Sequence, residues 1–191
     1  MSTVGWVGLG KLGLTCALAL AKHGGHRIVG YDPSPRPQDV LTGTAPPPEE
    51  DGIEELLNSS RTAVTLVPAP AEVVAASDGI VLVSVQTPHD PRYGCEAPTT
   101  ERPLDFEYGH LVQAVRDIST AAEQQGKNIT LVVISTVLPG TTRAHLAPLC
   151  GPRVRLVYGP YFIAMGTTVQ DFLQPEFVLL GSDDPEATAD V

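Results

Sequence analysis

Basic residues and long apolar runs are scarce in this chain of 191 residues, and each shortage excludes a class of protein. There are 12 lysines and arginines against 22 aspartates and glutamates, which gives a formal net charge of −10. Proteins that follow a nucleic-acid backbone or an anionic membrane surface need the opposite charge, so we expect neither partner here. No stretch approaches the roughly 18 consecutive apolar residues that cross a membrane. Hydrophobic residues still make up 42% of the chain, which suits one buried core and excludes wholesale disorder.

Cysteine is also rare, and its positions fit neither a disulfide framework nor a metal site. Cys16, Cys95 and Cys150 are far apart, odd in number and outside any CxxC or Cys/His spacing. The apolar run Leu12–Ala21 has the length of a signal-peptide core, but the residues before Lys11 carry no charged side chain. We therefore expect a cytoplasmic protein without a bound metal.

Short β-branched runs alternate with segments of helical spacing along the whole chain. We expect strands at Val4–Val7, Arg27–Tyr31, Thr62–Leu66, Gly79–Val85, Thr130–Ile134 and Val154–Val157. We expect helices at Lys11–His23, Asp51–Leu57, Ala69–Ala76, Asp105–Gln124 and Thr141–Leu149. This alternation predicts an α/β fold with a doubly wound parallel sheet in a single domain. We expect loops at Thr42–Glu50 and His89–Pro103, and the second begins where a strand ends, a common place for function.

The strongest local motif is Gly8–Gly13, a GxGxxG sequence between a predicted strand and a predicted helix. Gly8 permits the tight turn, Gly10 lets a pyrophosphate approach the backbone, and Gly13 lets helix and strand pack closely. The free N–H groups at the start of the helix then receive the phosphate charge. Asp32 closes the second strand, 19 residues after Gly13. A carboxylate there accepts hydrogen bonds from an adenosine ribose and repels a 2′-phosphate, which predicts NAD rather than NADP in a Rossmann fold.

Two alternatives to this interpretation stay open. A glycine-rich turn can occur without any ligand, because GxGxxG alone is a weak signal. Arg36, just beyond Asp32, has the charge to meet the 2′-phosphate of NADP, although an arginine in a solvated loop is the simpler interpretation.

Three later segments, each after a predicted strand, add motifs in a fixed order. They are Val85–Pro88 (VQTP), Ser135–Thr142 (STVLPGTT), and Tyr158–Gly166 (YGPYFIAMG) followed by Asp171-Phe172 and Pro175–Gly181. Together with the glycine motif, they resemble the NAD-binding domain of the UDP-glucose/GDP-mannose dehydrogenase family over essentially the whole chain. The segment STVLPGTT is the most specific single match, since it reproduces the family pattern S-T-V-x-P-G-T-T.

The resemblance implies an oxidoreductase that uses NAD to oxidise a CH–OH group of a nucleotide sugar for polysaccharide biosynthesis, with a homodimeric full-length protein. It places Thr87 and Thr136 in the NAD site, where a turn-capping hydroxyl is the alternative for either. It brings the Tyr158–Gly166 stretch to the sugar and the nicotinamide. The expected cofactor-binding residues are Gly8, Gly10, Lys11, Leu12, Gly13, Asp32, Val85, Thr87, Thr136 and Met165. The expected substrate-binding residues are Phe162, Ile163 and Ala164.

Some family features are absent from these residues. The G-x-C-x-x-K-D cysteine of the family does not occur, and no lysine follows Lys127. Gln86 and Gly159 replace a family proline and asparagine. Because Ser182–Ala187 resembles the start of a helix, we expect residues 1–191 to be the NAD-binding domain of a longer protein whose connecting helix and substrate domain lie beyond Val191. Alone, this domain would lack the catalytic cysteine and lysine.

Tyr161 and Met165 stand where the family has two glutamates. A glutamate can activate water for a second oxidation step, whereas methionine cannot. A tyrosine can act as an acid or base only if its pKa is lowered, so Tyr161 is either a catalytic candidate or a ring that merely packs. The replacements suggest a divergent branch that either stops after one hydride transfer or acts on an unusual substrate with a relocated base.

Two rival interpretations remain. Enzymes of the 3-hydroxyisobutyrate/6-phosphogluconate dehydrogenase group also open with a G-L-G-x-x-G turn, but they need a downstream catalytic lysine. A stand-alone nucleotide-binding or regulatory module would bind NAD without turnover.

Overall fold

The computed structural model describes residues 1–91 and 104–191. Most of the loop expected at His89–Pro103, with Cys95 in it, lies outside the described residues. In the described part of the chain, no helix has the length and apolar character needed to cross a membrane.

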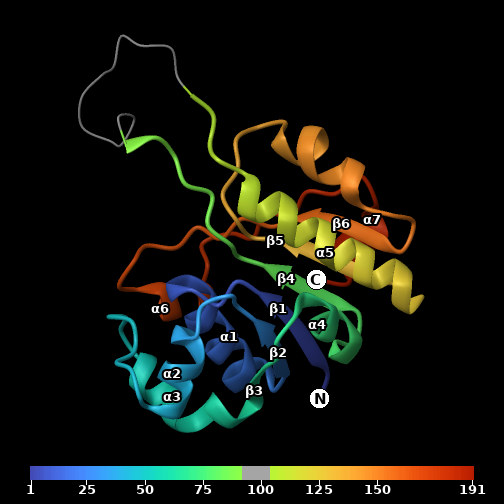
Figure 1. The fold of residues 1–191 in the computed structure, drawn as a ribbon. Helices are drawn as coiled ribbons and strands as arrows, with labels where there is room; N and C mark the ends of the chain where they lie inside the picture. The colour runs from blue at the N-terminus through green and yellow to red at the C-terminus, as the bar shows by residue number, and fades with distance from the viewer. Residues whose placement is uncertain (92–103) are drawn as a thin grey trace.

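A six-stranded sheet in the order β3-β2-β1-β4-β5-β6 forms the centre of the protein (Figure 1). All of its neighbouring strands are parallel. The strands are β1 (Thr3–Val7), β2 (Arg27–Tyr31), β3 (Val64–Leu66), β4 (Ile80–Val83), β5 (Ile129–Val133) and β6 (Val154–Tyr158). The chain leaves β1 toward β2 on one side and resumes at β4 on the other, so the connections diverge between β1 and β4. Ligands of doubly wound sheets bind at this divergence, outside the carboxyl ends of the strands.

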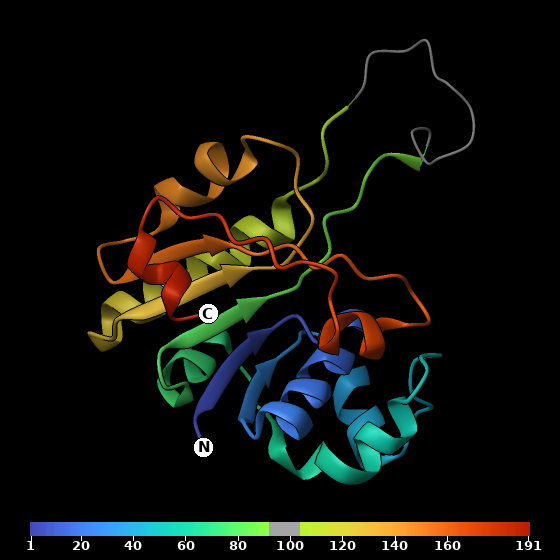
Figure 2. The ribbon, with the colours of Figure 1, turned by 180° about the vertical axis from the view of Figure 1, so that it is seen from behind.

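Helices cover both faces of the sheet, as Figures 1 and 2 show from opposite sides. The helices are α1 (Lys11–Gly24), α2 (Arg36–Thr42), α3 (Ile53–Ser60), α4 (Pro70–Ala76), α5 (Gly109–Gln125), α6 (Thr168–Leu173) and α7 (Pro185–Ala189). Side chains of α1, α2 and α3 share one buried cluster, and those of α4 and α5 share the other. Strand β5 contributes to both clusters, because Val132 lies in the first cluster while Leu131 and Val133 lie in the second.

The predicted fold class is confirmed, and all six expected strands are present. Helix α2 was missed, although its sequence carries the usual boundary signals. Pro37 lies in its first turn, and Gly43 caps its end in the left-handed conformation, with φ 82°. Val40 and Leu41 are buried on its inner side, so tertiary packing stabilises this short helix.

Two other expected helices differ from the prediction. The segment expected as a helix at Thr141–Leu149 forms a π-helical turn at Thr142–Leu146 and then a 3-10 turn at Ala147–Leu149, because Pro148 has no N–H for an α-helical ladder. Helix α5 begins at Gly109 rather than at Asp105. The Asp105 carboxylate accepts hydrogen bonds from the Phe106 N–H and the Tyr108 hydroxyl, which closes a separate turn before the helix.

Candidate cofactor-binding site

The turn between β1 and α1 is built around two glycines that no other residue could replace without movement. Gly8 has φ 91°, and a Cβ there would lie 2.8 Å from the backbone of Ser84. A Cβ on Gly13 would lie 2.1 Å from the Gly8 carbonyl oxygen. Helix α1 therefore starts in direct contact with the turn, with its axis aimed at the carboxyl ends of the strands.

Gly10 differs from its two neighbours because its missing side chain faces open space. A Cβ on Gly10 would meet no atom within 4 Å. Gly10 is also the N-cap of α1, where no side chain caps the helix, and the first turn of α1 contains no acidic residue. The start of α1 thus offers backbone N–H groups and the positive end of the helix dipole to a ligand.

Ser84 is a part of this turn that the sequence analysis missed. Its hydroxyl accepts a hydrogen bond from the Trp6 indole at 2.8 Å and donates one to the Gly8 carbonyl at 2.7 Å. It thereby satisfies a fully buried indole N–H and holds the end of β4 against the glycine turn. The available signal was Trp6 itself, since a tryptophan in a buried strand needs a nearby acceptor.

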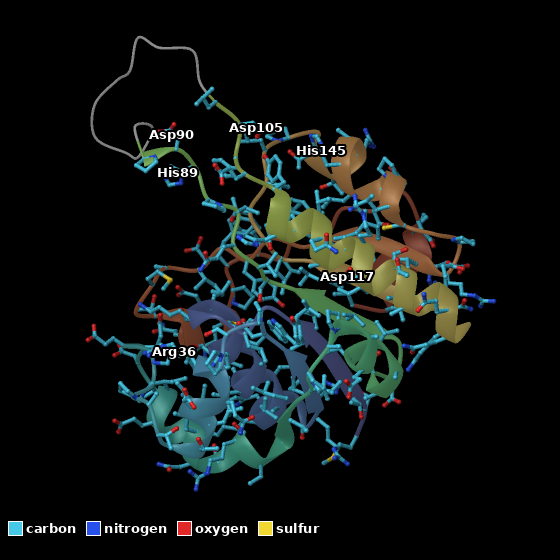
Figure 3. The ribbon with its side chains drawn as sticks, viewed as in Figure 1. Arg36, His89, Asp90, Asp105, Asp117 and His145 are labelled. Carbon is cyan, nitrogen blue, oxygen red and sulfur yellow. The ribbon has the colours of Figure 1, made fainter. Side chains whose placement is uncertain are left out.

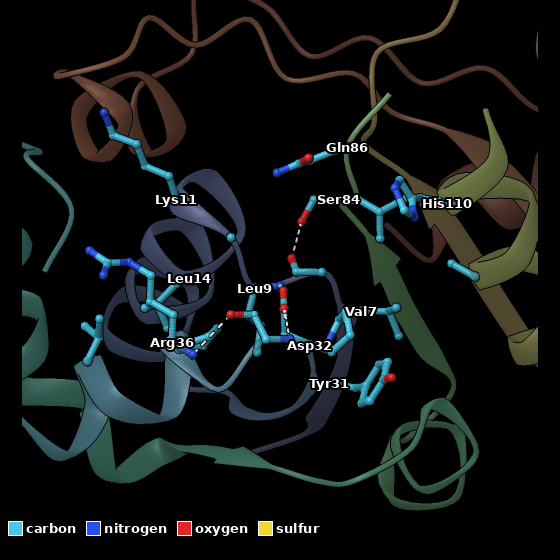
Figure 4. Close-up of a pocket in the computed structure, with 18 of the residues that line it drawn as sticks. Val7, Leu9, Lys11, Leu14, Tyr31, Asp32, Arg36, Ser84, Gln86 and His110 are labelled. Carbon is cyan, nitrogen blue, oxygen red and sulfur yellow. Dashed lines mark hydrogen bonds between the residues drawn. The ribbon is translucent and has the colours of Figure 1, made fainter. Parts of the chain in front are cut away.

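Asp32 lies at the side of the same turn, at the end of β2 (Figure 4). One carboxylate oxygen accepts a hydrogen bond from the Leu9 N–H at 2.7 Å, and the other accepts one from the Ser34 N–H at 2.9 Å. Each oxygen keeps a further lone pair, so the side chain is oriented without being saturated.

A cleft of about 1020 Å³ opens between these elements. Its lining includes Gly8, Gly10, Lys11, Asp32, Arg36, Val85, Gln86 and Asp117. Arg36 on α2 and Asp117 on α5 bound it from opposite sides (Figure 3). The Arg36 guanidinium donates to the Pro46 carbonyl at 3.4 Å, which turns it toward the proline-rich loop.

Leu12 is another expected cofactor residue. Its side chain packs against the core, so only its backbone is suited to a ligand.

The two expected threonines meet each other at the ends of β4 and β5. The Thr87 hydroxyl donates to the Thr136 carbonyl at 2.7 Å. Neighbouring Ser135 donates to the Val85 carbonyl at 2.7 Å, so two hydrogen bonds join these turns. Both threonines lie just beyond the residues that line the cleft. This bond joins two loops rather than capping a local turn, and the Thr87 oxygen retains the capacity to accept. The roles of both threonines toward NAD stay predictions.

The segment after β6 leaves the cleft and runs toward α6. The Tyr161 ring packs against Phe172 with ring centroids 5.3 Å apart. Burial, and secondarily the nearby Cys16, raises the pKa of Tyr161 well above its usual value. This favours the packing interpretation of Tyr161, because a base needs a lowered pKa.

The other expected residues of this segment are not brought into the cleft. The rings of Phe162 and Phe177 contact each other at a tilt of 46°, with their centroids 4.5 Å apart, and Phe162 is about half exposed. Met165 is 58% exposed. The Ala164 N–H donates to Asp171 at 2.9 Å, and Ile163 packs against the core. Their roles toward substrate and cofactor stay predictions.

Comparison with known proteins identifies the family of this chain. The model of the UDP-glucose/GDP-mannose dehydrogenase family, NAD binding domain, matches residues 2–191. The chain belongs to this family. The predicted family is therefore confirmed, and the rival dehydrogenase group is set aside.

Relatives from the family agree in sequence and in fold. GDP-mannose 6-dehydrogenase of Pseudomonas aeruginosa is 27% identical over 187 residues, which cover 94% of this chain and 40% of that protein. A UDP-glucose dehydrogenase from Pyrobaculum islandicum superposes with a TM-score of 0.84 at 27% identity, covering 100% of this chain and 43% of that one. A ternary complex of GDP-mannose dehydrogenase from Pseudomonas aeruginosa gives 0.83 at 26% identity, covering 99% and 42%. The chain thus spans about 40% of the length of the curated relatives that it matches.

Glu50 is a second residue of this dehydrogenase domain that the sequence analysis missed. Its side chain is fully buried, and one oxygen accepts hydrogen bonds from the Gly166 N–H at 2.8 Å and the Thr168 N–H at 3.1 Å. Its other oxygen lies 3.7 Å from the Lys11 ammonium. It therefore joins the first turn of α1 to the start of α6. No motif marked it, because a glutamate after a proline run usually lies in a solvated loop.

The described cysteines do not have the properties of nucleophiles. Burial, and to a smaller degree the charge of Glu50, raises the pKa of the Cys16 thiol well above its usual range. Burial also raises the pKa of the Cys150 thiol, to about 11. Both thiols are therefore protonated near neutral pH, whereas a cysteine nucleophile reacts as the thiolate.

Proposed function

We propose that this domain binds NAD in the cleft and that the protein containing it oxidises a CH–OH group of a nucleotide sugar. The observation that carries the proposal is the uncapped start of α1, where Gly10 leaves the backbone open, with the Asp32 carboxylate beside it. These are the two groups that an adenine dinucleotide needs, namely a pyrophosphate cradle and a ribose acceptor.

The residues of the cleft fit NAD one group at a time. The N–H groups of the Lys11–Gly13 turn, which are free of side-chain caps, suit the pyrophosphate. The free lone pairs of Asp32 suit the hydroxyls of the adenosine ribose, and its charge opposes a 2′-phosphate. Arg36 gives NADP little support, because its guanidinium is directed to the Pro46 carbonyl.

The carboxyl ends of β4 and β5 are suited to the other half of the dinucleotide. Val85 and Gln86 line the cleft there, and the Thr87–Thr136 hydrogen bond fixes the two turns next to them. NAD, when bound, supplies a hydride acceptor. In this proposal these residues orient that acceptor, and the raised pKa of Tyr161 leaves the proton of the alcohol to a base elsewhere.

The substrate proposal comes from the relatives, which are named for GDP-mannose and UDP-glucose. We propose a nucleotide sugar that approaches along Phe162, Ile163 and Ala164. Since no carboxylate stands at Tyr161 or Met165, we propose one hydride transfer per substrate; two NADH formed per substrate molecule by the full-length enzyme would contradict this. A cytoplasmic homodimer is the proposed state of the full-length protein, which cell fractionation and light scattering can test.

Titration calorimetry tests the cofactor assignment. We expect residues 1–191 to bind NAD and to bind NADP at least tenfold more weakly, because Asp32 repels the 2′-phosphate. Asp32→Ala should weaken NAD binding and so narrow the difference in affinity between NAD and NADP. Asp183→Asn is the control: it removes an exposed carboxylate outside this cleft, so neither affinity should change. Equal or tighter binding of NADP to the unaltered domain would overturn the assignment.

A further inference from the structure

The cleft contains an ion pair whose two charges lie in different surroundings. Lys11 is one of the residues that line the cleft, and its side chain is 44% exposed. The Glu50 side chain is 0% exposed. Figure 4 shows Lys11 extending from the first turn of α1 away from Asp32, toward the side of α6. The cation is therefore free to move, and the anion is fixed.

The fixed position of Glu50 comes from its backbone hydrogen bonds. One oxygen is held by the Gly166 and Thr168 N–H groups. The other oxygen is buried, and within residues 1–91 and 104–191 it has no hydrogen-bond partner. A buried carboxylate oxygen without a donor depends on a nearby cation, and Lys11 is the one at 3.7 Å.

The two charges have opposite effects on an anion at the start of α1. Lys11 attracts a diphosphate placed on the turn that contains its own backbone N–H. Glu50 repels the same diphosphate and also draws the ammonium away from it. Because the pair is neutral as a whole, the N–H groups and the helix dipole carry the attraction in the unaltered protein.

We propose that Lys11 and Glu50 form a charge-balanced pair that sets the affinity of the cleft for a nucleotide diphosphate, with Glu50 acting as a brake on binding. This inference rests on the proposed function, since it requires the diphosphate to lie at the start of α1. Glu50 is a positioning residue in this scheme: it acts on the ligand through its charge and through Lys11, without contacting the ligand.

A double-mutant cycle gives the proposal a definite order of affinities. Lys11→Met leaves the buried anion alone, so we expect ADP-ribose to bind about fivefold more weakly. Glu50→Gln leaves the cation alone and keeps an oxygen for the Gly166 and Thr168 N–H groups, so we expect binding about fivefold tighter. The double variant restores neutrality and should bind as the unaltered domain does.

Three controls separate charge from structure. Lys11→Arg keeps the cation and should bind ADP-ribose within about twofold of the unaltered domain. Adenosine, which has the same base and ribose without phosphates, should show no ordered change across the series. Raising the salt concentration should shrink the differences for ADP-ribose, because screening weakens charge effects. Thermal unfolding of each variant confirms that it is folded.

The outcomes distinguish the possible failures. If Glu50→Gln is folded and binds ADP-ribose more weakly, Glu50 has a structural role only and the proposal is overturned. A salt-independent series would overturn it as well. If the unaltered domain binds neither NAD nor ADP-ribose, the proposed function itself fails.

Discussion

The glycine turn at the start of α1 lines the cleft and the segment from Tyr158 to Gly181 does not, and the two regions differ in how completely the chain determines their conformation. At the turn, steric contacts exclude side chains at Gly8 and Gly13. The Ser84 hydroxyl donates to the Gly8 carbonyl and Asp32 accepts from the Leu9 N–H, which fixes the backbone. The second segment exposes large apolar side chains instead. These are Phe162, Met165, Phe177, Val178 and Leu179.

This chain therefore fixes the turn at the start of α1 through its own contacts and leaves an exposed apolar surface on the second segment. A turn that is fixed by its own contacts is arranged before the ligand arrives, so binding costs little conformational entropy there. The second segment is held by Glu50, by the antiparallel bridge of Tyr158 with Gly181, and by the packing of α6 on α1. Substitutions should therefore cost more stability at the turn than in the segment.

The largest effect is expected at Gly13. Gly13→Ala places a methyl group 2.1 Å from the Gly8 carbonyl oxygen, and the backbone must move apart to accept it. We expect the free energy of unfolding to fall by about 3 kcal/mol in urea denaturation.

Gly10→Ala is the matched control at the same turn. Its methyl group faces the open cleft, so stability should change by less than about 0.5 kcal/mol while NAD affinity falls roughly tenfold or more. Equal destabilisation by the two substitutions would show that the turn is not held by the contact between Gly13 and Gly8.

Ser84→Ala is expected to lower the free energy of unfolding by an intermediate amount. The substitution leaves the buried Trp6 N–H without its acceptor, which costs about 2 kcal/mol. Ser182→Ala is the comparison directly after the second region, where the hydroxyl donates to the Leu156 carbonyl at a half-buried position. There we expect less than about 1 kcal/mol. If thermal or urea unfolding gave the reverse order, the proposed difference between the two regions would be wrong.

Most of the fold and the glycine turn could be predicted from the sequence, because both depend on local rules. Periodicity gave the six strands, and the glycine spacing with Asp32 gave the turn and its neighbour at the end of β2. Ser84 and Glu50 were missed because their importance comes from partners distant in sequence, namely Trp6, Gly166 and Lys11. A contact between residues so far apart in the chain leaves no signal in the local sequence around either residue.

The same reason explains why the orientation of the Tyr161 side chain could not be predicted from the sequence. Tyr161 was a candidate for catalysis because it replaces a family glutamate, yet its ring is packed on Phe172. The sequence gives the identity of a replacement, and only the packing of α6 against α1 decides which way the side chain turns.

The smallest effect is expected from Tyr161→Phe, and it tests that packing. The phenol makes no hydrogen bond to the described residues, and the phenylalanine ring keeps the contact with Phe172, so stability at neutral pH should change by less than about 0.5 kcal/mol. NAD binding, and turnover by the full-length enzyme, should be unchanged.

At alkaline pH, the stability of the unaltered domain should differ from that of Tyr161→Phe. The pKa of Tyr161 in the folded protein is raised above the unfolded value of about 10. Above pH 10 the unfolded state therefore loses the phenol proton first, and the free energy of unfolding falls as the pH rises further. Urea denaturation at pH 9 and pH 11 should therefore show a steeper loss of stability for the unaltered domain than for Tyr161→Phe. A loss of turnover at neutral pH with unchanged stability would instead return Tyr161 to the list of catalytic residues.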